Sequence, residues 1–247
     1  MVDGRRVINE FGAMRFQAAG AAGVVEPGRV SLTALVVARN EAAQLAACLE
    51  RLAFADEVVV VLDRSSDDSA GIARRFGARV VEGAWELEGP RRNAGITACH
   101  GDWILEVDAD ERVGAALAAE IRAAIATAED GYFLVPMANY IGGRLVRFGW
   151  GAYNGVAAKA ALFHRAAKIW GAGRVHPKIE LKGPKRLLRH RLDHFVDDDF
   201  SDMFQRLNRD TDRAALDAFE AGTSFRLATT LRRVFSRAWK SFVARKG

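Results

Sequence analysis

The sequence predicts an α/β fold in which a mostly parallel β-sheet is flanked by helices, with a helical extension at the C-terminal end. Strand-like and helix-like segments alternate from Ser31 to Asp110, a pattern typical of parallel sheets covered on both faces. The segment EVVVVLD, residues 57–63, contains a continuous β-branched run, as expected for a strand buried on both faces. Beyond residue 223, apolar residues recur at helical spacing, which indicates the C-terminal helix.

The composition indicates a globular protein. Of the 247 residues, 50% are hydrophobic, which is enough for a full core. No window approaches the ~18 uncharged apolar residues that a membrane-spanning helix needs, and residues 1–16 lack the apolar block of a signal peptide. We therefore expect a cytosolic protein in which Cys48 and Cys99 are reduced core residues.

The charge of the chain is unevenly distributed. The net charge is +5, and residues 223–247 alone carry seven Lys or Arg residues and no acid. Such an imbalance favours an anionic partner, either a lipid surface or a nucleic acid. No recognised nucleic-acid module and no aromatic interleaving accompany these cations, so we expect an anionic membrane surface and no nucleic acid.

The elements of the first half follow from local signals. Residues 1–30 are Gly-rich and weakly patterned, and we interpret them as a loosely held leader. SLTALVVA is a predicted strand, after which Asn40 is expected to cap a helix with apolar residues at i, i+3, i+4 and i+7. Alternation then predicts, in order, strand 57–63, helix 68–77, strand 78–81, helix 91–100 and strand 103–110.

The second half changes character. A helix is predicted near residues 114–128. Aromatic residues and glycines then mix over residues 131–165, which indicates a meander of short strands and loops. We expect this meander to form the wall of the site for a second substrate. A polar helix is expected up to Gly222. We accordingly divide the chain into a leader (1–30), a sheet domain (31–222) and a basic amphipathic helix (223–247). This last helix is expected to lie on a membrane; the alternative is docking on the protein's own body.

Acidic residues stand at the ends of two predicted strands. Asp63 ends one, and GDWILEVDADERV ends another with Asp108 and Asp110. Residues i and i+2 of an extended chain share a side, so this D-x-D pair predicts a site for Mg²⁺ or Mn²⁺, which in turn binds a diphosphate. One alternative is a surface acidic turn. Another is a haloacid dehalogenase-type phosphatase, whose motif continues with Thr or Val where Arg112 stands. Neither a G-x-G-x-x-G nor a P-loop motif is present.

Four segments, in this order and spacing, resemble one known family. They are VVARNE, ADEVVVVLDRSSDDS, GPRRNAGITACHGDWILEVDADE and GAGRVHPKIEL. From about Ser31 to Gly222 the chain is similar to the family 2 glycosyltransferases of GT-A fold, and within them to bacterial lipopolysaccharide core-type glucosyltransferases. The resemblance implies a Rossmann-like GT-A sheet and a nucleotide-sugar donor.

The resemblance also implies roles for individual residues. Asp63 matches the carboxylate that accepts a hydrogen bond from uracil, and Asp110 matches a direct metal ligand with Asp108 near the ribose and metal. Arg92 and Asn93 match a basic helix start that faces the nucleotide. The loop that cradles the uridine would contain Ala38, Arg39 and Glu41. Simpler interpretations are that Asn40 and Asn93 only cap helices and that Asp63 only forms a turn.

The base that would activate the acceptor is less clearly indicated. The family reaction displaces the nucleotide at the anomeric carbon with inversion, so a base must take the acceptor's proton. Many relatives have His-Glu where this chain has His176-Pro177. Glu180 is the expected base, with His176 as the alternative; His176 can instead pack or bind phosphate. Trp150 and Trp170 are candidates to stack on sugar rings or to fill the core.

The function expected from these features is metal-dependent, inverting transfer of a hexose such as glucose from a UDP-sugar to a lipid-linked saccharide such as lipopolysaccharide core. The enzyme would lie peripherally on the inner face of the cytoplasmic membrane, where such an acceptor is found. The alternative is a non-catalytic saccharide- or membrane-binding protein that retains the GT-A fold, which the missing His-Glu pair motivates.

Overall fold

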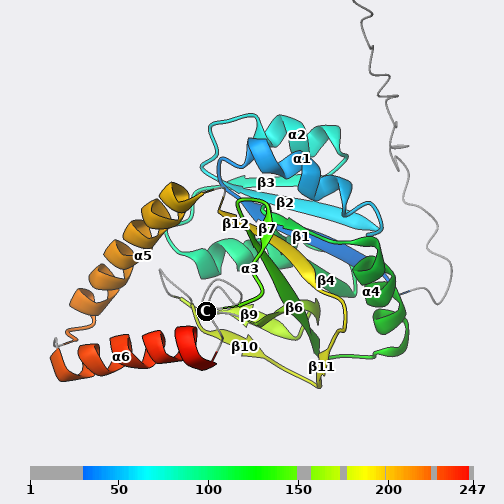
Figure 1. The fold of residues 1–247 in the computed structure, drawn as a ribbon. Coiled ribbons are helices and arrows are strands. Elements are labelled where there is room, and N and C mark those ends of the chain that lie inside the picture. Colours follow the sequence, from blue (N-terminus) through cyan, green and yellow to red (C-terminus); the bar gives the residue numbers. More distant parts are fainter. Residues whose placement is uncertain (1–29, 149–156, 173–176, 198, 224–226, 245–247) are drawn as a thin grey trace, which may run out of the picture.

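The computed structural model describes residues 30–148, 157–172, 177–197, 199–223 and 227–244. Strands and helices alternate in its first half, as predicted (Figure 1). The predicted leader, His176 and Trp150 lie outside the described residues. The elements of the first half are β1 (Leu32–Ala38), α1 (Ala42–Glu50), β2 (Glu57–Asp63), α2 (Ser69–Arg75), β3 (Arg79–Gly83), α3 (Glu88–Ala98) and β4 (Trp103–Asp108).

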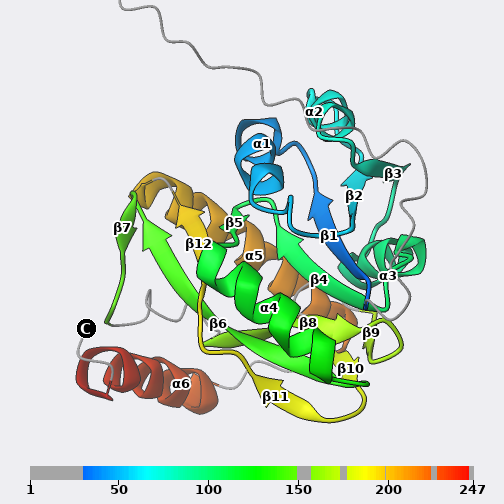
Figure 2. The ribbon, with the colours of Figure 1, turned by 90° about the vertical axis from the view of Figure 1, so that its right-hand side faces the viewer.

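The second half supplies shorter strands and the C-terminal helices. The predicted meander is present as several of these strands, and two long helices follow them (Figure 2). The elements are β5 (Glu111–Arg112), α4 (Ala115–Thr127), β6 (Tyr132–Ile141), β7 (Arg144–Leu145), β8 (Ala158–His164), β9 (Lys168–Trp170), β10 (Ile179–Leu181), β11 (Lys185–Leu187), β12 (Leu192–Asp197), α5 (Phe200–Glu220), α6 (Leu227–Trp239) and a π-helical turn (Lys240–Ala244).

One ten-stranded sheet organises the described residues. Its order is β3-β2-β1-β4-β8-β6-β12-β5, with β7 and β11 also pairing with β6. The strands β3, β2, β1 and β4 are all parallel, whereas β8 is antiparallel to both β4 and β6. The carboxyl ends of the parallel strands therefore lie at one edge, and β12 joins the sheet parallel to β6.

Both faces of the parallel strands are buried. Leu32, Ala34 and Val36 of β1 belong to a large apolar cluster that includes side chains from α1, α2 and α4. The alternate residues Leu35 and Val37 face a second cluster, against which α3 packs. Figure 1 shows α1 and α2 on one side of these strands and α3 on the other. The apolar run of β2 is buried on both faces for the same reason.

Three local predictions are wrong. The helix predicted to begin at Arg91 begins at Glu88, because Pro90 needs no N–H partner in a first helical turn. Asn40 does not cap α1, since Glu41 occupies that position and Asn40 adopts a left-handed φ of 55°. The extended chain ends at Asp108, and Asp110 lies in the turn that follows β4.

The C-terminal helices present apolar side chains to solvent. Phe204 and Phe219 of α5 are 60% and 83% exposed, and no residue of α6 is buried. No helix in the described part of the chain is both long and apolar enough to cross a membrane. The exposed apolar residues from α6 onward are Leu227, Leu231, Val234, Phe235, Trp239, Phe242 and Val243.

Candidate functional site

The loops after β1 and β2 are fastened to each other at the edge where these strands end. The side-chain oxygen of Asn40 accepts a hydrogen bond from the backbone N–H of Ser66 at 2.8 Å. The backbone N–H of Ala42 donates to Asp67 at 2.9 Å, and Asn40 and Arg64 both have left-handed φ angles. Such strained backbone persists only where its surroundings hold it, so the two loops form one fixed rim.

Asp63 ends β2 with only 3% of its surface exposed. It accepts two hydrogen bonds from Arg64, at 2.9 and 3.1 Å, and one from the backbone N–H of Trp85 at 3.1 Å. Arg91 lies 3.4 Å from the same carboxylate. Burial alone would raise the pKa of Asp63, but the hydrogen bonds from Arg64 and Trp85 hold it below its ordinary value. Asp63 is therefore a charged acceptor.

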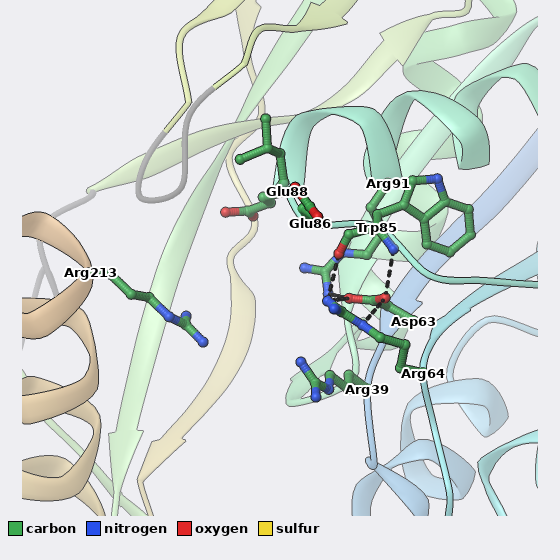
Figure 3. A pocket seen from close by; sticks show the side chains of 9 residues that line it. Arg39, Asp63, Arg64, Trp85, Glu86, Glu88, Arg91 and Arg213 are labelled. Atoms are coloured by element: carbon green, nitrogen blue, oxygen red, sulfur yellow. Dashed lines mark hydrogen bonds and ion pairs between the residues drawn. The ribbon is translucent and has the colours of Figure 1, made fainter. Parts of the chain in front are cut away.

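A pocket opens beside Asp63. Its wall contains Asp63, Arg64 and Arg91, together with Arg39 from the end of β1. Arg213 of α5 faces this group from the other side (Figure 3). Of the residues predicted for the uridine cradle, Arg39 lines the pocket, whereas Ala38 is buried in the sheet.

Arg92 is enclosed by carboxylates next to this pocket. It forms ion pairs with Glu88 at 2.8 Å, with Asp108 at 3.1 Å and with Glu106. Burial alone would lower the pKa of Arg92, but the charges of Asp108 and Glu106 raise it well above its ordinary value. The structure thus places Arg92 between α3 and β4 as a buried cation.

Glu106 is the centre of a second set of contacts. It accepts hydrogen bonds from Lys168 at 2.7 Å and from the indole N–H of Trp170 at 3.2 Å. Although burial opposes ionisation, Lys168 and Arg92 lower the pKa of Glu106 to about 2. The amide group of Asn93 donates to and accepts from the backbone of Trp170, at 2.7 and 3.0 Å. Asn93 therefore holds β9 against α3 rather than capping a helix.

Asp108 and Glu111 share Lys159. Its ammonium lies 2.6 Å from Glu111 and 3.3 Å from Asp108. With Arg92 on its other oxygen, Asp108 has both carboxylate oxygens engaged, and its pKa lies well below the ordinary value because Arg92 and Lys159 outweigh burial. Burial and the charges of Asp108 and Asp110, opposed by Lys159, raise the pKa of Glu111 to about 7.

Asp110 has an oxygen available for a cation. Its Oδ1 is buried without a hydrogen-bond partner among the described residues, while its Oδ2 lies 3.3 Å from His194 Nε2. The amide oxygen of Asn139 lies 3.0 Å from His194 Nδ1. An amide oxygen only accepts, so Nδ1 carries a proton. Burial alone would lower the pKa of His194, but the hydrogen bond and the charge of Asp110 raise it above its ordinary value. A metal bound at Nε2 would take the place of the proton there.

The negative charge around Asp110 also fits a cation. Burial and the nearby carboxylates of Asp110, Asp67 and Asp108 raise the pKa of Glu41. No group of three or more His, Cys, Asp or Glu side chains in the described part of the chain is arranged as a metal cage. A Mg²⁺-type ion needs no such cage, because one or two protein ligands and substrate phosphates suffice. The residues present therefore fit a divalent metal held partly by its substrate.

Glu180 lies away from this cluster. It is exposed, and β10 pairs with β9 so that Glu180 stands opposite Ile169. Directly paired residues share one face of a sheet, and Ile169 is 47% exposed. Its neighbour Trp170, on the other face, contacts Glu106 and Arg92. The structure thus shows no contact between Glu180 and the acidic cluster, and His176, the alternative base, lies outside the described residues.

The amino-acid sequence of this chain matches the model of a known protein family. The model described as "Glycosyl transferase family 2" matches residues 33–169, which is more than half of the chain. The chain belongs to glycosyltransferase family 2. Within this family 2 domain, the matched range contains Asp63, Arg92, Asp108 and Asp110 but ends before His194.

Curated relatives match a shorter part of the chain. An uncharacterised glycosyltransferase of Rickettsia felis is 35% identical over 91 residues, which cover 36% of this chain and 32% of that protein. The lipopolysaccharide core biosynthesis glycosyltransferase LpsC of Rhizobium meliloti is 28% identical over 94 residues, which cover 36% of this chain and 35% of LpsC. The matches thus span about a third of the length of these relatives.

Solved structures confirm the predicted GT-A fold of the family 2 domain. Residues 1–349 of S. aureus TarS in complex with UDP-GlcNAc superpose with a TM-score of 0.52 and 17% identity, covering 68% of this chain and 59% of that one. Mannosyl-3-phosphoglycerate synthase from Rubrobacter xylanophilus gives a TM-score of 0.50 and 14% identity, covering 80% of this chain and 77% of that one. At this identity the likeness concerns the fold.

The sequence did not single out three residues of this site. All three are far along the chain from the acidic strand ends. Lys159 and His194 contact Asp108 and Asp110, and Arg213 lines the Asp63 pocket. Arg91 could have been found from the sequence, because it directly precedes the predicted Arg92 and Asn93 in the segment GPRRN.

Proposed function

We propose that the chain is an inverting glycosyltransferase that uses a divalent metal, Mg²⁺ or Mn²⁺, to transfer a hexose such as glucose from a UDP-sugar to a lipid-linked saccharide. The observation that carries this proposal is Asp110, whose buried Oδ1 has no partner among the described residues, at the strand-end edge beside the Asp63 pocket. Ligands bind at this edge in open α/β sheets.

Asp110 and His194 are the proposed protein ligands of the metal. Asp110 offers a free oxygen, and Asn139 orients the His194 ring so that Nε2 faces it. Asp108, predicted as a ligand too, is better placed to orient this region, because Arg92 and Lys159 already hold both of its oxygens. The metal would neutralise the charge on the departing diphosphate.

The nucleotide would occupy the Asp63 pocket. Asp63 is charged and accepts hydrogen bonds, which suits a ring N–H of uracil, and Arg39 stands beside it. The backbone loop of Arg39 and Glu41 is fixed by its bonds to residues 65–69, so the cradle is formed before the ligand arrives. TarS, which shares the fold, is known in complex with UDP-GlcNAc, and this supports a uridine nucleotide.

The acceptor is proposed to be a lipid-linked saccharide such as lipopolysaccharide core. The name of LpsC, lipopolysaccharide core biosynthesis glycosyltransferase, supports this class. The exposed apolar face of α6, combined with its cations, supports a position on the inner face of the cytoplasmic membrane. In this proposal residues 31–222 are the catalytic domain and residues 223–247 the membrane-associating segment.

A screen of UDP-sugars tests the function. Purified protein is incubated with each UDP-sugar, with and without Mn²⁺, and UDP release and protection against thermal unfolding are measured. We expect one donor to be hydrolysed slowly and to protect the protein in the presence of the metal. Absence of both effects for every UDP-sugar would favour the alternative, a saccharide- or membrane-binding protein that retains the fold.

The role of Asp110 is tested by substitution. Asp110→Ala should abolish transfer and metal-dependent UDP binding while the protein stays folded, because the Asp110 side chain is partly exposed and lies in a turn, where it contacts His194. The control is Glu82→Ala, which removes an exposed ion pair with Arg74 of small energetic value. Undiminished, metal-dependent activity of Asp110→Ala would contradict the assignment.

The base is proposed to lie in the segment containing His176 and Glu180. Glu180→Gln should lower turnover far more than donor binding, because a base acts only after the acceptor is in place. The same measurements on His176→Ala decide between the two, and the assignment is reversed if that variant loses more turnover.

A further inference from the structure

The donor pocket receives one wall residue from far along the chain. Arg39, Asp63, Arg64 and Arg91 belong to the first half of the sheet, whereas Arg213 extends from α5 toward them (Figure 3). Helix α5 begins shortly after β12 and contacts it. The pocket is thus enclosed by the sheet edge on one side and by a C-terminal helix on the other.

The charges of the pocket are not all matched. Asp63 is paired with Arg64 and Arg91, and Glu88 is paired with Arg92. The remaining acid, Glu86, is exposed. The pKa of Arg64 is raised mainly by its hydrogen bond to Asp63, and the charge of Glu86 adds to this rise. Within the part of the chain that the structure describes, the guanidinium groups of Arg39 and Arg213 have no hydrogen-bond or ion-pair partner. Unmatched positive charge therefore enters one pocket from the loop after β1 and from α5.

The orientation of α5 supports a ligand in this position. Arg213 follows Phe204 by nine residues, about two and a half turns at ~3.6 residues per turn, so the two side chains lie on opposite faces. Phe204 is 60% exposed, while Arg213 faces the pocket. A helix held on the protein by burial of its apolar side chains would turn Phe204 toward the protein and Arg213 toward solvent. An anion bound between α5 and the sheet edge would explain why α5 turns the face with Arg213, rather than the face with Phe204, toward the pocket.

We propose that Arg213 binds the diphosphate of the nucleotide donor and completes the pocket from α5. The proposal rests on the proposed function, because the ligand is the UDP part of the donor. A guanidinium suits this task, since its planar fork pairs with two phosphate oxygens at once and it remains charged at any physiological pH. The uracil ring carries no charge, so Arg213 is assigned to the phosphates and Asp63 to the base.

The experiment compares two ligands that differ only in the phosphates. Dissociation constants of UDP and uridine are measured on the full chain with Mn²⁺, by calorimetry and by NMR titration. Arg213→Gln should weaken UDP binding by about tenfold or more, as expected for a lost hydrogen bond to a charged group, and leave uridine binding unchanged. Arg213→Lys should retain part of the UDP affinity, because it keeps the charge but not the fork.

Arg209→Gln is the matched control. It removes the same charge one helical turn earlier, from an exposed residue that does not line the pocket, and should leave UDP affinity within about twofold. Unchanged UDP binding in Arg213→Gln overturns the proposal, and so does an equal loss of UDP and uridine, which would mean a change in pocket shape. If the wild-type protein binds neither ligand, the proposed function itself fails.

Discussion

Asp63 shows at the scale of one residue that the proposed uracil acceptor already has partners in the absence of a ligand. Arg64, Arg91 and the backbone of Trp85 all contact its carboxylate. Because Arg64 is 42% exposed at its side chain, it can be displaced more easily than the buried contacts. Binding of uracil at Asp63 would then be an exchange of partners.

The first residue-level prediction concerns this exchange. Asp63→Ala should weaken UDP binding by about 1.5–3 kcal/mol, the usual range for a hydrogen bond to a charged group, and should narrow the preference for UDP over ADP. Calorimetric titration of the variant and of Glu82→Ala measures both effects. Equal UDP affinity in Asp63→Ala and wild type would remove Asp63 from the site.

The position of a side chain was predictable from the sequence where that side chain ends its own strand. Asp63 and Asp108 end apolar runs, and the sheet places both at one edge. His194 could not be found in this way, because its link to Asp110 depends on pairing between β12 and β5. The family motif pointed to Arg92 and Asn93, but their actual contacts, with three carboxylates and with the Trp170 backbone, required the packed structure.

At the scale of elements, Glu57 at the start of β2 connects several neighbours. Its carboxylate accepts hydrogen bonds from Thr33 of β1 at 2.6 Å, from Arg79 of β3 at 3.0 Å and from the backbone of His100 at 2.9 Å. Burial alone would raise the pKa of Glu57, but these donors lower it. Glu57 therefore stabilises the amino-terminal edge of the parallel strands, opposite to the candidate site.

The Glu57 carboxylate makes the free energy of unfolding depend on pH. Since its folded pKa lies below the ordinary value of 4.5, its contribution is fully present above that pH and is lost as the pH falls through the folded value. Glu57→Gln should cost about 1.5–3 kcal/mol at pH 7, and the difference from wild type should shrink below pH 4.5. Urea denaturation across this range measures it; a difference independent of pH would contradict the prediction.

The boundaries of elements were predicted less well than their order. Helix α3 begins before Arg91, because the sequence rule that places a helix start at polar or basic residues overlooked Pro90 in the first turn. Gly89 also allows the helix to begin here, since a Cβ on residue 89 would overlap the carbonyl oxygen of Gly171. That close approach of two segments is a tertiary contact, and no local pattern encodes it.

At the scale of the whole molecule, the exposed apolar residues are concentrated on the C-terminal helices. Leu231, Phe235 and Trp239 of α6 are all largely exposed, and Arg232 and Arg237 belong to the same helix. The fold class and the parallel core were predictable from alternation and burial patterns. The sequence could not predict whether α6 rests on the protein or on another surface, because both arrangements require the same amphipathic sequence.

A membrane prediction follows from this distribution. The full chain should co-sediment with anionic liposomes at low salt and less at high salt, because each cation near an anionic leaflet adds about 1 kcal/mol that salt screens. A version ending at Gly222 should remain in the supernatant, and neutral liposomes serve as the control. Equal pelleting of both versions on anionic liposomes would show that the tail is not the anchor.

The pairing of β12 with β5 has a consequence for the chain during its synthesis. The rim around Asp63 and Arg39 can form once the first four strands have left the ribosome, whereas Asp110 meets His194 only after β12 has been made. At ~5–20 residues per second, these events are separated by several seconds of translation. A nascent chain would therefore pass through a stage with the rim around Asp63 but without the contact between Asp110 and His194. The proposed transfer would begin only after β12, and helix α5 behind it, are in place.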